Sequence, residues 1–272
     1  MPELRAPSWV DFEREGWGPR AEAYHRFFAP ICTGVASSVL DAVGAGGGTR
    51  LLDACCGPGY LAGCALGRGC RASGVDISEA MVALAGRLYP QGTFRVGDVE
   101  KLPYEDGEFD VVVCNIGIHH VTDPARALAE FRRVLAPGGR IALTVWDDAR
   151  SQVGIVKEAI MAAGPVSPPE LPLPLKRPDY ATQDEVRGLL EPAGLRMDGL
   201  TPLEIVQRYE SPEALWEGWL PTAIRTGPLF AAQPAQVRQA ARHAFAEMVG
   251  KHIAADGSVQ LQAGLLLITG HR

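Results

Sequence analysis

The segment Leu-Leu-Asp-Ala-Cys-Cys-Gly-Pro-Gly at residues 51–59 has the composition of a ligand-binding turn. Gly57 and Gly59 allow a ligand to approach the backbone closely, and a helix that begins after them offers free N–H groups to a carboxylate or phosphate. Asp53 adds a carboxylate that would repel a pyrophosphate and attract an ammonium group. Because the glycine spacing also fits a dinucleotide-binding turn, this segment alone predicts a ligand loop without specifying the ligand.

Three further polar residues follow apolar runs at strand-like spacing. Asp76 follows the second run and is suited to accept both hydroxyls of a ribose, in NAD as in other nucleosides. Asp98 and Val99 follow the third run, and a carboxylate beside a backbone N–H matches the amino group and a ring nitrogen of adenine. Asn115 ends the fourth run. Since ligands bind at the carboxyl ends of the strands in open α/β sheets, we expect these residues at one edge.

Two histidines, His119 and His120, come just after the fourth run. A neutral imidazole there is placed to take a proton from an acceptor oxygen or nitrogen. We predict His119 as the general base and a packed, structural ring at His120, with His120 as the alternative base. A loop histidine satisfied by its neighbours is the simpler interpretation of His119.

The elements that would position these residues alternate between strand and helix. Short apolar runs typical of buried parallel strands are separated by segments of helical periodicity, one with Ser78 as its cap and one beginning at Asp123-Pro124 and stopping at Pro137-Gly138-Gly139. This pattern predicts a doubly wound parallel sheet covered on both faces. The expected strands are residues 51–54, 71–75, 93–97, 109–114 and 141–146.

The pattern changes after residue 150. A proline-rich connection at 164–178 is followed by a predicted helix at 182–191, a strand at 200–208, a helical stretch at 211–250 and a strand at 259–269. We therefore predict a mostly parallel, seven-stranded α/β sheet with a helical cap inserted between its last two strands. The predicted divisions of this single domain, 1–272, are an N-terminal helical segment 1–48, a cofactor-binding core 49–150, a connecting segment 151–210, a cap 211–257 and a last strand 258–272.

Composition excludes several classes of function. The formal net charge of −6 and the absence of a basic run argue against nucleic-acid binding. No apolar run is long enough to span a membrane. With no export signal in the sequence we expect a cytoplasmic protein whose six cysteines are reduced thiols. Their spacing predicts no metal site, and the oligomeric state is not determined.

Four segments together resemble the class I S-adenosylmethionine-dependent methyltransferases, in their small-molecule, ubiquinone/menaquinone-type branch. They are LLDACCGPGY, GVDISEAM, GDVEKLPYEDGEFDVVVCN and IHHVTDPARALAEFRRVLAPGGRIALTVW, which cover residues 50–146 in order. The resemblance implies S-adenosylmethionine as cofactor. It places Asp53, Gly57 and Gly59 around the methionine part, Asp76 on the ribose, Ile77 and Met81 against adenine, Asp98 and Val99 at the adenine edge, and the backbone of Asn115 and Ile116 at the methionine ammonium.

One departure from the family pattern is Cys55, which stands where many relatives have glycine. Its side chain should point into packing. Simpler roles remain for the acidic residues: Asp53 as a cap of the following turn, Asp76 as a helix cap, and Asp98 as a solvated loop residue. The two glycines fit a tight turn alone.

The resemblance implies methyl transfer to an oxygen, nitrogen or carbon nucleophile of a small molecule, of the kind found in natural-product metabolism. Two alternatives are a protein that binds the same cofactor without transferring methyl and an NAD(P)-dependent oxidoreductase. Asp53 and the absence of a Tyr-x-x-x-Lys pattern count against the latter. The side chains that could shape the acceptor pocket are Tyr24, Trp146, Trp216, Trp219 and Arg225. For most of them core packing is the more common role, because large aromatic residues usually stabilise packing.

Overall fold

The computed structural model describes residues 8–174 and 180–272. Residues 1–7 of the predicted N-terminal segment and 175–179 of the predicted connecting segment therefore lie outside the described residues.

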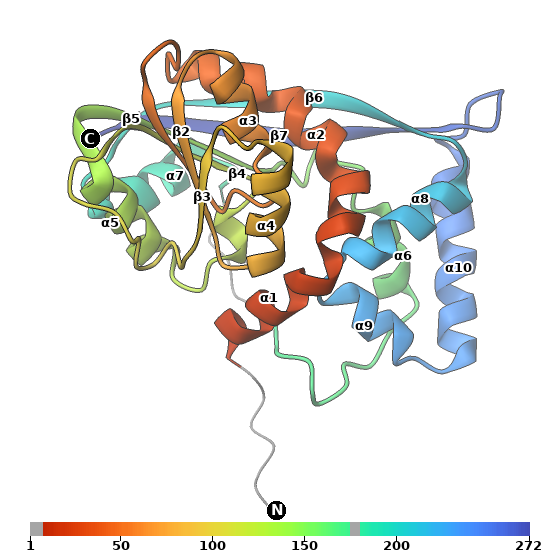
Figure 1. The fold of residues 1–272 in the computed structure, drawn as a ribbon. Coiled ribbons are helices and arrows are strands. Elements are labelled where there is room, and N and C mark those ends of the chain that lie inside the picture. The colour runs from red at the N-terminus through yellow and green to blue at the C-terminus, as the bar shows by residue number, and fades with distance from the viewer. Residues whose placement is uncertain (1–7, 175–179) are drawn as a thin grey trace, which may run out of the picture.

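A single seven-stranded sheet forms the centre of the molecule, in the order β3-β2-β1-β4-β5-β7-β6 (Figure 1). Strand β7 is antiparallel to both of its neighbours, and the other pairs are parallel. The predicted mostly parallel, doubly wound architecture is confirmed. The strands are β1 (Arg50–Ala54), β2 (Arg71–Asp76), β3 (Thr93–Val96), β4 (Phe109–Asn115), β5 (Leu135–Trp146), β6 (Arg196–Tyr209) and β7 (Val259–His271).

Two hydrophobic cores lie on opposite faces of the sheet because successive strand residues point to opposite sides. Leu51 and Val113 belong to one core, and Leu52 and Val112 to the other. A strand buried on both faces must be apolar throughout, which explains the unbroken valines of β4. Helices α2 (Ala21–Ala42), α3 (Tyr60–Gly67) and α6 (Ile155–Ala162) cover the first face, and α5 (Pro124–Val134) and α7 (Gln183–Leu190) cover the second.

The helical cap lies between β6 and β7, as predicted. It consists of α8 (Pro212–Trp219), α9 (Thr226–Ala231) and α10 (Ala235–Gly250), which stand together at one end of the molecule in Figure 1. The stretch predicted as helical at 211–250 is thus interrupted. Pro221 lies in a short 3-10 turn after α8, and Pro234 directly precedes α10, because proline cannot continue a helix from the preceding turn.

Two helix starts are confirmed, whereas one strand start was predicted too late. Ser78 caps α4 (Glu79–Leu88) and Asp123 caps α5, each through its side-chain oxygen. Strand β5 begins at Leu135 instead of residue 141, because Pro137-Gly138-Gly139 form an irregularity inside the strand rather than its boundary: the register with β4 shifts there. Helix α6, inside the segment predicted as a connection, was not predicted.

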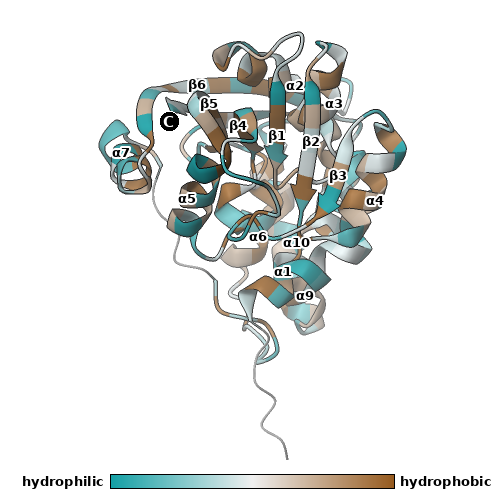
Figure 2. Ribbon diagram, turned by 60° about the vertical axis from the view of Figure 1, so that its left-hand side comes forward, coloured by the Kyte–Doolittle hydropathy of each residue, from teal (hydrophilic) through white to brown (hydrophobic). Residues whose placement is uncertain are grey.

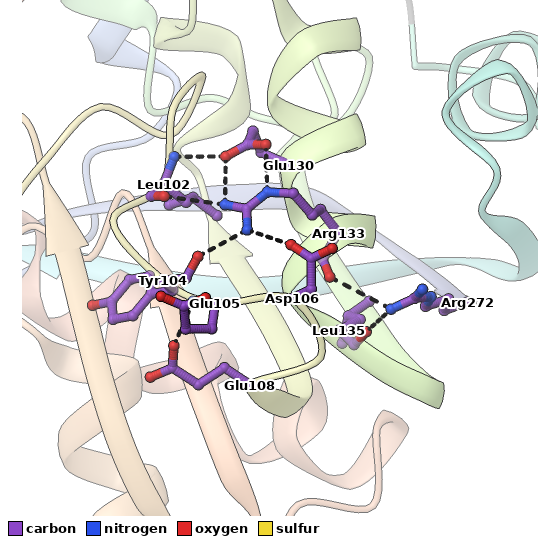
Figure 3. Close-up of polar contacts among 9 residues, drawn as sticks. All are labelled: Leu102, Tyr104, Glu105, Asp106, Glu108, Glu130, Arg133, Leu135 and Arg272. Carbon is purple, nitrogen blue, oxygen red and sulfur yellow. Dashed lines mark hydrogen bonds and ion pairs between the residues drawn. The ribbon is translucent and has the colours of Figure 1, made fainter.

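The connection between β3 and β4 is fastened to α5 by one guanidinium group (Figure 3). Arg133 donates to both carboxylate oxygens of Glu130, at 2.7 and 2.8 Å, and to the backbone oxygens of Leu102 and Tyr104. It also pairs with Asp106 at 2.9 Å. The hydrogen bond from Arg133 holds the pKa of Glu130 below its usual value. This network fixes the loop that begins with the predicted adenine-binding residues.

Replacement of this arginine tests the network. We expect Arg133→Met to lower the free energy of unfolding by about 1.5–3 kcal/mol, the cost typical of losing hydrogen bonds to a charged group, as measured by urea denaturation. The control is Arg187→Met, which removes an exposed ion pair with Asp184 on α7 and should change stability by less than about 1 kcal/mol. Equal losses of stability in Arg133→Met and Arg187→Met would contradict the role of Arg133 in fastening this loop to α5.

Candidate functional site

The predicted ligand residues meet at the carboxyl ends of β1, β2 and β4. Asp53, at the end of β1, is 1% exposed. Its Oδ2 accepts a hydrogen bond from the backbone N–H of Ala62 at 3.0 Å. The predicted alternative, a cap for the following turn, is therefore present in the structure. No described residue donates a hydrogen bond to its Oδ1, and Asp53 helps to line a small cavity, so the carboxyl group has an oxygen left for a ligand.

Asp76, at the end of β2, joins two loops. Its Oδ2 accepts from the N–H of Gly57 at 2.8 Å and its Oδ1 from the N–H of Ser78 at 2.9 Å. The side chain thus holds the glycine-rich loop after β1 against the start of α4. Any ribose contact would use the remaining lone pairs of these oxygens, since each carboxylate oxygen can accept more than one bond.

The two acidic groups share a poorly solvated environment. Burial, with a further contribution from nearby Asp76, raises the pKa of Asp53 to about 8. Burial also raises the pKa of Asp76, although the hydrogen bonds from Ser78 and Gly57 oppose the shift. Neither group forms an ion pair with any described residue. Two neighbouring buried carboxyl groups favour a positively charged ligand and disfavour an anionic one.

Backbone strain marks the same edge. Cys55 and Ile116, just beyond β1 and β4, have φ values of 55° and 56°, a region that non-glycine residues rarely adopt and β-branched ones least of all. Ile116 is held by Thr144, whose backbone oxygen and Oγ1 both accept from its N–H. Such strain clusters at functional sites. The Cys55 side chain packs against the second core beside Cys114 and Gly117, as expected.

The two predicted glycines serve different purposes. A Cβ on Gly59 would lie 2.9 Å from the ring of Phe94 and 3.0 Å from Ala85, so packing requires glycine there. A Cβ on Gly57 would meet no atom within 4 Å, although φ is +51°. It would stand in open space beside a cavity of about 20 Å³ that Tyr24, Asp53 and Gly57 help to line. Gly57 therefore offers its bare backbone to a ligand.

The predicted adenine-side residues surround the next strand ends. Met81 is buried with Leu84 and Ala21, and Ile77 is half-buried. Val99 is buried, whereas Asp98 is half-buried and accepts from the N–H of Glu100 at 2.9 Å. This bond within the loop matches the simpler role predicted for Asp98, that of a loop residue without a ligand contact. The adenine contacts of these residues stay a prediction.

The histidine pair lies in a 3-10 turn, Ile118–His120, and a glutamate that the sequence analysis missed contacts it. His119 is 7% exposed, whereas the His120 side chain is 30% exposed and its Nδ1 lies 3.1 Å from Oε1 of Glu13. Glu13 is a buried residue of α1 (Trp9–Trp17). The only sequence signal for this contact is the four-residue spacing of Trp9, Glu13 and Trp17.

The candidate acceptor residues fall into two groups. Tyr24 borders the cavity near Asp53, and its ring stacks on Phe28, which in turn contacts Trp146. These side chains form an aromatic row beside the site. The structure does not bring the cap residues into this row.

The three cap candidates are engaged in packing or in holding the connecting segment. Trp216 is 1% exposed and packs on Phe230 and Phe245. Trp219 is buried in the first core. Arg225 donates to the backbone oxygen of Pro172 and to Ser167. These contacts match the packing role that the sequence analysis gave as the alternative for these residues. Binding of the acceptor by Trp216, Trp219 and Arg225 stays a prediction.

Comparisons with known proteins agree with this geometry. Residues 52–143 match the family model described as a methyltransferase domain. A demethylmenaquinone methyltransferase from Renibacterium salmoninarum is 38% identical over 103 residues, which are 38% of this chain and 44% of the relative. The family model spans β1 to β5, the segment that carries the strained loops and both buried acids. Over this segment the chain is similar to methyltransferase domains.

Similarity of the whole chain to solved structures shows its fold. Haemonchus contortus phosphoethanolamine N-methyltransferase 2 aligns with a TM-score of 0.59 and 21% identity, covering 100% of this chain and 61% of that one. The 4+2 cyclase SpnF aligns with a TM-score of 0.52 and 20% identity, covering 88% and 80%. The chain spans less than half the length of the curated relatives it matches.

A larger cavity, of about 350 Å³, lies at the opposite end of the sheet. It is lined by the end of α2 and by Arg140, Asp198 and His271. None of the predicted site residues borders it. Asp198 already pairs with His271 at 2.8 Å, and Arg140 is exposed. We therefore place the functional site at the strained edge, despite the smaller cavity there.

The open space at Gly57 yields a prediction with a matched control. Gly57→Ala should fold with a modest loss of stability, about 1–2 kcal/mol for an alanine with positive φ, and lose at least tenfold in affinity for S-adenosylhomocysteine in titration calorimetry. Gly48, in a turn before β1, has φ +83° and equally open surroundings. Gly48→Ala should cost similar stability and leave binding unchanged. Unaltered binding in Gly57→Ala would place the ligand elsewhere.

Proposed function

We propose that this chain is an S-adenosylmethionine-dependent methyltransferase that acts on an oxygen, nitrogen or carbon nucleophile of a small molecule. The observation that supports it most is the pair of buried acids, Asp53 and Asp76, beside the open backbone at Gly57. When bound, the cofactor supplies an electrophilic methyl group on a positively charged sulfur.

The charge at this edge distinguishes the proposal from a dinucleotide-binding enzyme. A pyrophosphate at the start of α3 would lie beside the buried carboxyl of Asp53, which would raise its energy. The ammonium group of a methionine part would instead favour the ionised form of Asp53 and donate a hydrogen bond to its carboxylate. Ribose hydroxyls would donate to Asp76, which already orders the adjoining loops.

The proposed cofactor requires movement of the residues that cover the edge. The cavity of about 20 Å³ is far below the roughly 300–1,000 Å³ of small-molecule sites. Tyr24, Tyr60 and Cys32 line it from the helices. We infer that the part of α2 that carries Tyr24 shifts outward to admit the cofactor and then closes again, which would exclude water from the reacting groups.

The acceptor is proposed to enter beside Tyr24 and Trp146. Phe28 connects these two rings, so the row favours an acceptor with an apolar or planar body. We propose His120, the alternative in the sequence analysis, as the general base in place of His119, because its side chain is 30% exposed and contacts a buried carboxyl group. Among described residues no helix is long and apolar enough to cross a membrane. The cytoplasmic location expected from the sequence stays a prediction.

Methyl transfer itself is tested by product mass. The protein is incubated with S-adenosylmethionine bearing a deuterated methyl group and a panel of phenols, hydroxy acids, amines and hydroquinones. We expect one acceptor class to gain the labelled methyl in step with S-adenosylhomocysteine formation, and calorimetry to show no binding of NADP. Cofactor binding with unlabelled but rearranged products would favour the non-methylating alternative, and NADP binding would favour the oxidoreductase.

The pKa of Asp53 predicts a pH dependence of cofactor binding. Below about pH 8 the free protein holds a proton on Asp53, and an incoming ammonium group favours the ionised form. Affinity for S-adenosylhomocysteine should therefore rise from pH 5.5 to 7.5, by up to about tenfold per pH unit, the slope of one released proton. Asp53→Asn should bind more weakly and without this slope. A flat profile in the wild type would contradict the assignment.

The same pKa affects the free protein in the opposite direction. A carboxyl whose pKa is raised on folding contributes stability at low pH that is lost as pH rises from about 4 toward about 8. The melting temperature of the wild type relative to Asp53→Asn should accordingly fall over this range. This control needs no ligand, and an unchanged difference would show that Asp53 is ionised in the folded protein.

A further inference from the structure

One face of α1 is directed at a single residue, His120. Trp9, Glu13 and Trp17 follow each other at four-residue spacing and so lie on one side of the helix. The indole N–H of Trp9 donates to the backbone oxygen of His120 at 3.3 Å. The ring of Trp17 meets the imidazole edge to face, with centroids 5.3 Å apart. Glu13, between them, reaches Nδ1.

The contact with Glu13 determines which ring nitrogen carries the proton. A carboxylate at Glu13 can only accept hydrogen bonds, so we infer that Nδ1 of His120 donates to Oε1 of Glu13 across their 3.1 Å separation. In the neutral ring, Nε2 is then the nitrogen with a free lone pair. It has no hydrogen-bond partner among the described residues, and the side chain keeps 30% of its surface exposed.

Glu13 is itself held in place. Its side chain is 4% exposed, and its Oε2 accepts from the indole N–H of Trp17 at 2.7 Å. Asp76 is near enough for its charge and that of Glu13 to affect each other, and His120 offsets part of this repulsion. His119 adjoins His120 on the other side, with ring centroids 4.7 Å apart. Glu13 is therefore a buried acid whose two carboxylate oxygens each face a hydrogen-bonding group, the indole N–H of Trp17 and Nδ1 of His120.

We propose that Glu13 is the positioning residue that orients His120 as the general base for the acceptor, an inference that rests on the proposed methyl transfer. The arrangement is that of a base held by hydrogen bonding to a third group. Because α1 supplies Glu13 and the turn after β4 supplies His120, the base is complete only when α1 lies against that turn.

A general base at His120 helps only an acceptor that loses a proton. We therefore expect the methylated group to be a hydroxyl or an ammonium group. The acceptor atom forms a bond to the methyl carbon while the carbon–sulfur bond breaks and its electron pair stays on sulfur. The acceptor's proton passes to Nε2 of His120, and the resulting imidazolium is stabilised by Glu13. A carbon nucleophile that is already activated would need less of this help.

The tautomer of His120 tests the positioning role without any acceptor. Long-range ¹H–¹⁵N correlation spectra of protein labelled in histidine, with S-adenosylhomocysteine bound, distinguish the two neutral tautomers. We expect the proton on Nδ1 in the wild type. In Glu13→Gln the amide oxygen should accept from Trp17, its NH₂ should face Nδ1, and the ring proton should move to Nε2. His271, which pairs with Asp198 far from this site, is the matched control: Asp198→Asn should leave His120 unchanged.

The catalytic role is measured with the acceptor found in the labelled-methyl screen. Glu13→Gln and His120→Gln should each lower the single-turnover rate by about 10²-fold or more, and affinity for S-adenosylhomocysteine should change less than threefold. The two substitutions together should cost little more than either alone, since they act as one unit. Asp198→Asn should keep the wild-type rate.

Four results would overturn the proposal. A wild-type spectrum that places the ring proton of His120 on Nε2 excludes the positioning role of Glu13. This measurement does not depend on the folding of any variant. If Glu13→Gln transfers the labelled methyl group at the wild-type rate, Glu13 does not orient a general base. The proposed methyltransferase function would then still stand. With the proton on Nδ1, transfer to carbon nucleophiles alone would exclude the role as base, and no transfer to any acceptor would refute the proposed function as well.

Discussion

The carboxyl group of Asp76 constrains the whole edge of the sheet on which function depends. One oxygen holds the N–H of Gly57 and the other that of Ser78, so the loops that follow β1 and β2 cannot separate without leaving a buried acid unpaired. Such a loss is costly because the group is already poorly solvated. The same carboxyl group thus ties the glycine-rich loop to the residue that caps α4.

The features that could be predicted from the sequence are those that local chemistry determines. The valines of β4 indicate a strand buried on both faces, and Ser78 and Asp123 mark helix starts by accepting N–H groups three residues ahead. The glycines of the first loop and the acids after β1 and β2 lie close to the elements that position them. Their meeting at one edge follows from parallel strand order, as does the cap between the last two strands.

What could not be predicted depends on contacts between distant segments. Pro137-Gly138-Gly139 look like a boundary locally, but pairing with β4 on both sides absorbs them as an irregularity in β5. Arg225 has the chemistry of a ligand clamp, and only the path of the connecting segment gives it Pro172 and Ser167. Glu13 and His120 are 107 residues apart, and no local pattern relates them.

Helix α1 connects two parts of the site that the sheet keeps separate. Its Trp17 packs against the small cluster of Ala21, Met81 and Leu84, on the side of α4, while the same indole bonds to Glu13 and touches His120. In Figure 2 helix α1 lies beyond the ends of the strands and not against a face of the sheet. A ligand that moves Met81 or lifts Trp17 therefore disturbs Glu13 as well. The proposed cofactor contacts and the proposed base are therefore linked through one helix, because a packed side chain cannot shift without its neighbours.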